Sequence, residues 1–183
     1  MSVTDRNAFQ HIAESVSDLS PEEFKGAFRS HPAGVAVVTA QGENGPAAMT
    51  VSSLFSVSAV PPLLVFSASA LSSSTASIRS AETLVVHMLT SDDLELARLC
   101  ATSGADRFDG SIPWSRLDTG EPYFEGVKTT LRGQIVNQLD AGASTLIIVK
   151  ALDVRNQGVS VARPLVYHNR TWHALDGAST IAG

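Results

Sequence analysis

The sequence is poor in cysteine and in charged residues, and both shortages exclude whole classes of protein. Cys100 is the only cysteine among 183 residues, so the chain can form neither an internal disulfide nor a cysteine zinc cluster, and a cytoplasmic location is expected. Only 17% of the residues are charged, and 13 Lys and Arg against 18 Asp and Glu leave a net charge of −5. Because a nucleic-acid binder needs a basic surface, that function is not expected.

Long apolar runs and the common motifs of enzymes and nucleotide binders are missing as well. The longest apolar stretch, AVPPLLVF at 59–66, contains two prolines and is too short to span a membrane, and the first ten residues do not resemble a signal peptide. Neither GxxxxGKS/T nor GxGxxG occurs, and TSGAD at 102–106 indicates a helix end rather than the elbow of a serine hydrolase. His168 and His173 can lie diagonally on one hairpin, but no third ligand accompanies them, so we expect satisfied or surface histidines rather than a metal site.

The apolar residues that are present, 44% of the chain, are spaced mostly as in strands. One helix start is clear, because Ser20 and Glu23 form a capping box with Pro21 in the first turn. A hairpin is predicted at 164–175, with its turn at Asn169-Arg170 and with Tyr167 opposite Trp172. The other expected elements are strands at 34–40, 47–59, 61–69, 82–89, 128–138 and 144–154, helices at 72–80 and 92–102, and a loop at 103–127.

This order of elements predicts a mainly β protein with flanking helices. The strands do not alternate with helices as they do around a parallel sheet, so we expect a closed antiparallel barrel with helices at its ends. The length suits a single domain at 21–176, preceded by an N-terminal arm at 1–20 and followed by a tail at 177–183.

Hydroxyl side chains are concentrated in two segments, MTVSS at 49–53 and SASALSSST at 67–75. The second segment runs from a strand end into a predicted helix start, where backbone N–H groups and hydroxyls together can bind a phosphate. A single helix cap from Ser72 or Ser73 is the simpler interpretation, but one cap needs only one hydroxyl. Arg107 could add charge to a phosphate site, or could pair with Asp106 or Asp109.

Several segments, in this order, resemble the flavin reductase-like family of FMN-binding split-barrel proteins. They are HPAGVAVVTA, MTVSSLFSVSAVPPLLVFSAS, SSST, VVHML, ATSGADRFDG and PW, and the resemblance covers about residues 22–175. The resemblance implies an antiparallel split β-barrel, a homodimer and a bound FMN or FAD. It also implies hydride transfer from NAD(P)H to the flavin, with reduced flavin supplied to a partner monooxygenase. In such chemistry the flavin reacts and the protein aligns the two rings, so no catalytic acid or base is required.

The resemblance also implies which residues bind the cofactor. The first hydroxyl segment would lie along the flavin ring, the second would hold the ribityl chain and phosphate, and an Arg-Phe pair would lie near the phosphate or the dinucleotide. The expected cofactor-binding residues are Met49, Thr50, Val51, Ser52, Ser53, Ser67, Ala68, Ser69, Ser72, Ser73, Ser74, Thr75, Arg107 and Phe108.

One segment departs from the family pattern. Many members carry Gly-Asp-His between the two late strands, where this chain has Gly142-Ala143-Ser144. The missing histidine predicts weakened use of NAD(P)H and leaves an alternative open, a flavin-binding electron carrier with no nicotinamide activity of its own. A third possibility is another flat ligand, such as a deazaflavin, heme or pyridoxal phosphate.

Overall fold

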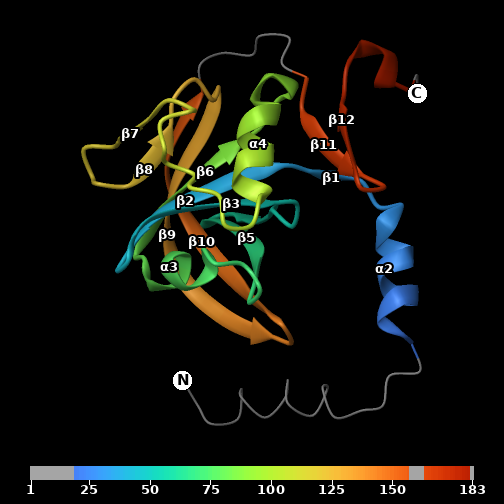
Figure 1. The fold of residues 1–183 in the computed structure, drawn as a ribbon, viewed down its shortest axis with the longest axis horizontal. Coiled ribbons are helices and arrows are strands. Elements are labelled where there is room, and N and C mark those ends of the chain that lie inside the picture. The colour runs from blue at the N-terminus through green and yellow to red at the C-terminus, as the bar shows by residue number, and fades with distance from the viewer. Residues whose placement is uncertain (1–18, 157–162, 182–183) are drawn as a thin grey trace.

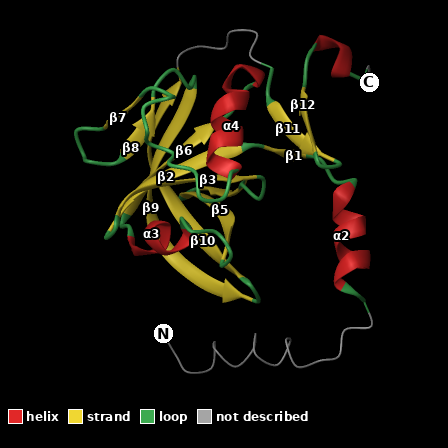
Figure 2. Cartoon of the chain, in the orientation of Figure 1, coloured by secondary structure: helices red, strands yellow, loops and turns green. Residues whose placement is uncertain are grey.

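The computed structural model describes residues 19–156 and 163–181, which form a mainly β structure with short helices (Figures 1 and 2). The helices of these ranges are α2 (Pro21–Arg29), α3 (Thr75–Ser80) and α4 (Leu94–Ala101), with 3₁₀ turns at Ser91–Asp93 and Gly177–Ser179. The strands are β1 (Ala33–Gly34), β2 (Ala36–Gly42), β3 (Gly45–Val51), β4 (Phe55–Ala59), β5 (Pro62–Ser69), β6 (Thr83–Met88), β7 (Trp114–Arg116), β8 (Pro122–Phe124), β9 (Thr129–Ala141), β10 (Ser144–Asn156), β11 (Leu165–His168) and β12 (Thr171–Ala174). None of the described helices is long and apolar enough to cross a membrane.

A seven-stranded antiparallel sheet, in the order β3-β2-β6-β9-β10-β5-β4, forms the body of the molecule. Two smaller sheets, β1-β11-β12 and β7-β8, lie beside it. The ladders of the described residues do not close, because β3 and β4 each pair with a single neighbour. The mainly β, antiparallel fold is therefore confirmed, whereas the expected closed barrel is not found.

The sheet curls around one core and carries a second core on its outer face. Met49 on β3 and Phe66 on β5 share the first core, although their strands are not paired with each other. Strand β2 contributes side chains to both cores, with Val38 in the first and Val37 in the second. Leu96 on α4 belongs to the second core. Since burial of each such large apolar side chain contributes about 1.5–3 kcal/mol, the second core holds α4 and the β11–β12 hairpin against the sheet.

Local signals in the sequence were reliable at both ends of the domain. Ser20 and Glu23 form the predicted capping box, in which the N–H of Glu23 donates to Oγ of Ser20 at 3.3 Å and the N–H of Ser20 donates to Oε2 of Glu23 at 3.0 Å. In the hairpin, Tyr167 pairs with Trp172 as expected, and their ring centroids lie 4.8 Å apart.

Two expected elements are wrong in ways that shape the site. The single strand expected at 47–59 is interrupted at 52–54, so that β3 pairs with β2 whereas β4 pairs with β5. The loop expected at 103–127 contains the short hairpin β7–β8. The break at 52–54 turns the chain from one edge of the sheet to the other and leaves Ser52 exposed at the surface.

His87 fastens the β7–β8 hairpin to the main sheet. Its ring is fully buried, with Nδ1 3.1 Å from the carbonyl oxygen of Val37, while Nε2 accepts a hydrogen bond from the N–H of Phe124 at 3.0 Å. The bond from Phe124 makes Nε2 the unprotonated nitrogen, so Nδ1 carries the proton and donates to Val37. Burial lowers the pKa of His87 to about 4 and outweighs the backbone hydrogen bonds to Val37 and Val85, which raise it. His87 is thus an internally satisfied histidine, as expected.

Candidate functional site

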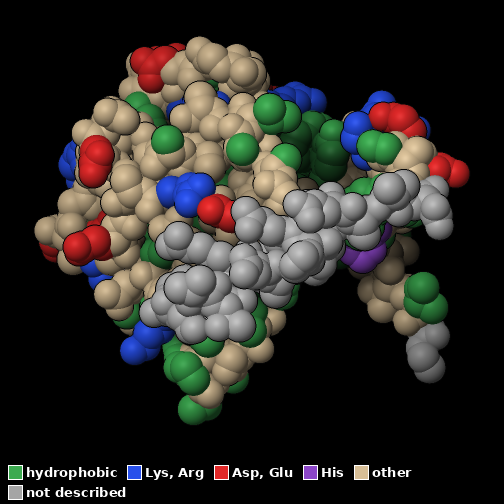
Figure 3. Space-filling model, turned by 90° about the horizontal axis from the view of Figure 1, so that it is seen from below, with side chains coloured by type: hydrophobic (Ala, Val, Ile, Leu, Met, Phe, Trp, Pro, Cys, Tyr) green, Lys and Arg blue, Asp and Glu red, His purple; other side chains and the backbone are tan. Residues whose placement is uncertain are grey.

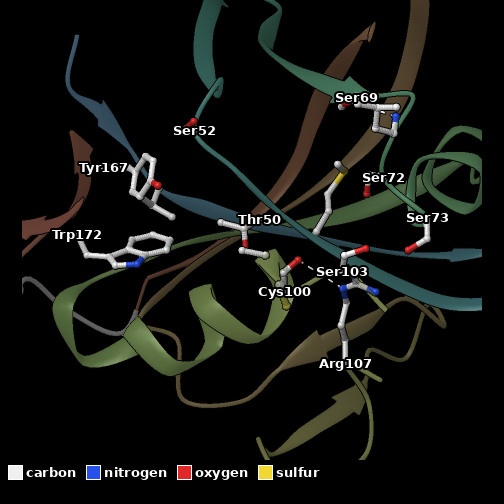
Figure 4. Close-up of a pocket in the computed structure, with 14 residues that line it drawn as sticks. Thr50, Ser52, Ser69, Ser72, Ser73, Cys100, Ser103, Arg107, Tyr167 and Trp172 are labelled. Atoms are coloured by element: carbon white, nitrogen blue, oxygen red, sulfur yellow. Dashed lines mark hydrogen bonds between the residues drawn. The ribbon is translucent and has the colours of Figure 1, made fainter. Parts of the chain in front are cut away.

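A pocket of about 440 Å³ lies where β3, the loop before α3, the end of α4 and the β11–β12 hairpin meet (Figure 4). We call it the hydroxyl pocket, because Thr50, Ser52, Ser69, Ser72, Ser73 and Ser103 line it. The structure brings seven of the fourteen expected residues to its wall: Met49, Thr50, Ser52, Ser69, Ser72, Ser73 and Arg107.

Three of the other expected hydroxyls are used to hold the backbone in place. Ser53 donates to the carbonyl oxygen of Ser67 and accepts from its N–H at 2.9 Å. Ser74 donates to the carbonyl oxygen of Ala48 at 2.7 Å, and Thr75 donates to that of Ser69 at 2.6 Å. These bonds fix the loop before α3 against β3 and β5, and they leave none of the three hydroxyls for a ligand in this arrangement.

The helix cap expected from the serine cluster is not formed. Helix α3 begins at Thr75, and its N-cap residue Ser74 makes no side-chain capping bond because its hydroxyl points to Ala48 instead. Ser72 accepts a weak bond from the N–H of Ser74 at 3.4 Å, which bends the loop rather than capping the helix. The hydroxyls on the pocket wall are therefore not consumed by the helix.

Five serines keep their hydroxyl protons available to a ligand. Within the described ranges, no side-chain hydrogen bond involves Ser52, Ser73 or Ser103, and Ser69 and Ser72 only accept from backbone N–H groups. Thr50 differs, because it donates to the carbonyl oxygen of Ala97 at 2.7 Å and so presents only its lone pairs to the pocket.

Arg107 supplies the positive charge of the pocket and also caps the C-terminal end of α4. Its guanidinium donates to the carbonyl oxygens of Cys100, Ala105 and Thr102 at 3.4, 3.3 and 3.1 Å. Among the described residues it forms no ion pair with a carboxylate, so the pairing with Asp106 or Asp109 that the sequence left open does not occur. The charge therefore remains available to an anion beside Ser73 and Ser103 (Figure 4).

Cys100 lies in the pocket wall but is not a nucleophile at neutral pH. It is buried, and burial raises the pKa of its thiol to about 12 even though the nearby charge of Arg107 acts to lower it. Cys100 therefore serves as an apolar wall, in agreement with the core position expected from the helical pattern around it.

The opposite end of the pocket is aromatic, which the sequence did not reveal. Tyr167 and Trp172 reach in from the β11–β12 hairpin, at the far side of Thr50 from Arg107 and Ser73 (Figure 4). The cross-strand pair was predicted, but no sequence signal connected a hairpin near the C-terminus with β3. The pocket thus has an aromatic end and a cationic, hydroxyl-rich end, as a ligand with a flat ring and an anionic tail would require.

The remaining expected residues lie outside the pocket wall. Val51 and Ala68 are buried in the first core, and Ser67 lies on β5 next to Ser53. Phe108 packs its ring parallel to that of Phe124 at a centroid distance of 5.4 Å.

The Gly142-Ala143 turn between β9 and β10 lies beside the loop that carries the serines. The carbonyl oxygen of Ala143 accepts from the N–H of Ala70 at 3.0 Å, and Ser144 pairs with Ser69. Gly142 has a φ of +61°, which suits glycine in this tight turn. His168 and His173 have ring centroids 5.6 Å apart on the hairpin, and within the described ranges no group of three potential metal ligands is found.

The fold and the pocket together define a mainly β protein built to bind a small ligand. Residues 28–176 match the model of the flavin reductase like domain. An NADH:FMN oxidoreductase of Rhodococcus erythropolis is 37% identical over 153 residues, which cover 82% of this chain and 80% of the relative. The chain therefore belongs to the flavin reductase like family.

Solved structures agree with this assignment. A flavin reductase domain protein from Arthrobacter sp. FB24 superposes with a TM-score of 0.79 at 30% identity, over 85% of this chain and 96% of that one. BorF, the flavin reductase component of a bacterial two-component tryptophan halogenase, superposes with a TM-score of 0.76 at 27% identity, over 86% and 99% of the two chains.

Proposed function

We propose that this protein is an NAD(P)H:flavin oxidoreductase that binds FMN or FAD in the hydroxyl pocket. The observation that carries the proposal is the polarity of the pocket, with an aromatic pair at one end and Arg107 with unengaged serine hydroxyls at the other. A flavin has the same polarity, because a flat ring system is joined through a ribityl chain to a phosphate. The Rhodococcus relative, an NADH:FMN oxidoreductase, supports the same activity for this chain.

The residues of the pocket fit the cofactor part by part. Arg107, Ser72, Ser73 and Ser103 would bind the phosphate, since charge-assisted hydrogen bonds are the strongest that such groups make. Met49, Thr50 and Ser52 would lie along the ring, and Ser69 beside the ribityl chain. The other expected residues would act indirectly by holding these in place: Val51, Ser53, Ser67, Ala68, Ser74, Thr75 and Phe108.

The chemistry needs binding and alignment from this chain rather than an acid or a base. A bound flavin supplies the hydride-accepting ring. The protein's own part would be to hold that ring with the residues of β3 and the aromatic pair, and to exclude water with Val35, Met49 and Cys100. This division of work agrees with a pocket whose only thiol has a pKa of about 12.

The experiment that tests the proposal is flavin bleaching. Purified protein is mixed with FMN or FAD and then with NADH or NADPH, and absorbance near the flavin band is followed. Reduction well above the rate without protein supports the oxidoreductase. A protein that binds neither flavin, or that binds another chromophore, would overturn it.

One observation favours a second candidate, a flavin carrier without nicotinamide activity. The turn beside Ser69 offers a methyl group at Ala143 and a hydroxyl at Ser144, where the family pattern that the sequence resembles would place an aspartate and a histidine. We predict that Ala143→Asp with Ser144→His raises kcat/KM for NADH severalfold and leaves flavin affinity unchanged. Unchanged NADH kinetics would show that the turn does not limit the reaction, and a tight flavin complex that neither nucleotide reduces would favour the carrier.

The finer architecture and the partners belong to the same proposal. We propose that the sheet, which curls around the first core, is a split β-barrel. We also propose that the protein is a homodimer, because large apolar side chains are exposed on β4, β9 and β10, among them Phe55, Val57, Val136 and Val154. A flavin-dependent monooxygenase would receive the reduced flavin, as the two-component system of BorF suggests. The cytoplasm, which supplies NAD(P)H and keeps Cys100 reduced, is the proposed location.

A further inference from the structure

A second and larger groove opens next to the hydroxyl pocket. It has a volume of about 770 Å³ and lies between α2, the 52–55 turn and the β11–β12 hairpin. Ser52 and Tyr167 line both spaces, so the groove continues the aromatic end of the pocket. Figure 3 shows the lobe that contains α2, at the right, with basic, acidic and hydrophobic side chains on its surface.

The groove is basic in a chain that is acidic overall. Lys25, Arg29 and Arg170 line it, together with two histidines, and no Asp or Glu is among its lining residues. Lys25 pairs at the rim with Glu22 at 3.0 Å, whereas Arg29 and Arg170 form no ion pair within the described ranges. Three of the chain's 13 Lys and Arg residues therefore face one space in a protein with a net charge of −5.

The backbone holds the two arginines near each other. The carbonyl oxygen of Arg29 accepts a hydrogen bond from the N–H of Asn169 at 3.0 Å, which joins the end of α2 to the turn of the hairpin. Asn169 and Arg170 have φ values of +48° and +61°, so the turn is a tight one in which both central residues are left-handed. Arg29 and Arg170 thus come from the two elements joined at one end of the groove. Phe24 and Phe28 supply aromatic surface along the rest of it.

An adenosine diphosphate group fits this chemistry, because it combines a flat aromatic base with two adjacent negative charges. Both FAD and NAD(P)H contain such a group. The position of the groove distinguishes them. In FAD the flavin phosphate is itself one of the two phosphates of this group, and the proposed function places that phosphate at Arg107. The groove, however, opens from the opposite, aromatic end of the pocket (Figure 4).

We propose that the groove binds the adenosine diphosphate half of the nicotinamide dinucleotide, with Arg29 and Arg170 on its pyrophosphate. This inference rests on the proposed function and deepens it. Ser52 and Tyr167 then mark the junction at which the nicotinamide leaves the groove and meets the flavin pocket. Binding energy gained on the adenosine diphosphate half would help to align the nicotinamide ring. The Gly142-Ala143-Ser144 turn has no histidine ring that could donate a hydrogen bond for this purpose.

The test compares NADH with reduced nicotinamide riboside, which lacks the adenosine diphosphate group. In the Arg29→Gln, Arg170→Gln double variant, we expect KM for NADH to rise roughly ten- to a hundredfold, as for the loss of charge-assisted hydrogen bonds. Rates with the riboside, and KM for FMN and FAD, should stay unchanged. The matched control is Arg155→Gln with Arg163→Gln, which removes two exposed positive charges elsewhere.

Four outcomes would overturn the inference: an unchanged KM for NADH, an equal loss with NADH and the riboside, a loss confined to FAD, or a double variant whose subunits dissociate. The last outcome would make the groove a subunit contact. A wild-type protein that reduces flavin with neither nucleotide would instead contradict the proposed function. In that case calorimetry with ADP-ribose tests the groove independently of flavin reduction. Binding to wild type that is lost in the double variant supports the site, and no binding to wild type excludes it.

Discussion

At the scale of the residue, the neighbouring serines Ser73 and Ser74 have different roles. Ser73 is exposed on the pocket wall, and within the described ranges its hydroxyl has no hydrogen-bond partner. Ser74 is 4% exposed, and its hydroxyl donates a hydrogen bond to the carbonyl oxygen of Ala48. A donor that satisfies a buried carbonyl stabilises the fold, whereas an exposed hydroxyl can be given to a ligand at little cost.

This contrast predicts that two adjacent alanine substitutions separate binding from stability. Ser73→Ala should weaken FMN binding roughly tenfold and leave riboflavin binding unchanged, because riboflavin lacks the phosphate. Ser74→Ala should lower the free energy of unfolding by about 1–3 kcal/mol, because the carbonyl of Ala48 loses its partner. Fluorescence titration and urea denaturation measure the two effects. Equal losses of FMN and riboflavin in Ser73→Ala would place the phosphate elsewhere.

At the scale of the element, helix α3 depends on a close approach to the end of β2. A Cβ atom on Gly42 would lie 2.4 Å from the carbonyl oxygen of Ser77 and 2.7 Å from its Cα, so the backbone of one element would have to move. The loop with Ser72 and Ser73 leads directly into α3. The glycine at the end of β2 therefore controls where the pocket hydroxyls lie.

We expect Gly42→Ala to destabilise the protein by about 1–3 kcal/mol and to weaken FMN binding, because the displaced helix carries the serine loop with it. Gly26→Ala is the matched control, since a Cβ at Gly26 meets nothing within 4 Å and alanine favours the helix. Thermal unfolding and FMN titration of both variants check this. A stable Gly42→Ala protein with normal affinity would show that α3 tolerates the shift.

The links that His87 makes among β6, β2 and β8 predict a specific pH dependence. Its pKa is about 4 in the folded protein and 6.5 when exposed, so the unfolded chain binds the proton first as the pH falls. The contribution of neutral His87 to the free energy of unfolding is complete above pH 6.5. The free energy of unfolding then falls by about 3 kcal/mol in total between pH 6.5 and pH 4. Burial acts to raise the pKa of Glu121, but hydrogen bonds, of which the one from Arg132 is the strongest, lower this pKa to about 2. The contribution of Glu121 to the stability of the folded protein is therefore lost only as the pH falls below 4.5.

Urea denaturation at pH 7 and pH 5 measures this slope. The exposed His173→Gln variant should keep it, and a His87→Gln variant that folds should lose it. The ring signals of wild-type His87, followed by NMR, give the pKa directly even if that variant does not fold. A His87 that titrates near 6.5 would contradict the prediction.

Elements whose signals are local were predictable, and elements set by long-range contacts were not. Ser20, Pro21 and Glu23 fix the start of α2 within four residues, and the hairpin turn at Asn169-Arg170 is equally local. The start of α3 depends on Ser74 reaching Ala48, 26 positions away, and no spacing rule predicts that contact. For the same reason the sequence could not separate the expected residues that line the pocket from those that lie outside its wall, and the aromatic end was missed.

At the scale of the whole molecule, the alternating pattern of 47–59 could not reveal how the sheet ends. The pattern indicated one strand, but pairing with different partners divides it and places its halves at opposite edges of the sheet. Large apolar side chains are exposed on the two long strands of this sheet, β9 and β10. Among the large hydrophobic residues, Val136 is 48% exposed, Leu152 is 45% exposed and Val154 is 60% exposed on the two long strands.

These exposed residues predict a dimer that a single charge can break. The three side chains lie on adjacent strands, where a second copy could cover them together with Phe55 and Val57 of β4. We expect wild type to sediment with the mass of two chains and Val154→Asp to sediment as a folded monomer, because a buried, unpaired carboxylate strongly opposes association. Ile181→Asp is the control, since Ile181 is 92% exposed and lies in the C-terminal segment away from these strands. A monomeric wild type would mean that the apolar surface serves another partner, and an equally dimeric Val154→Asp would place the interface on a different face.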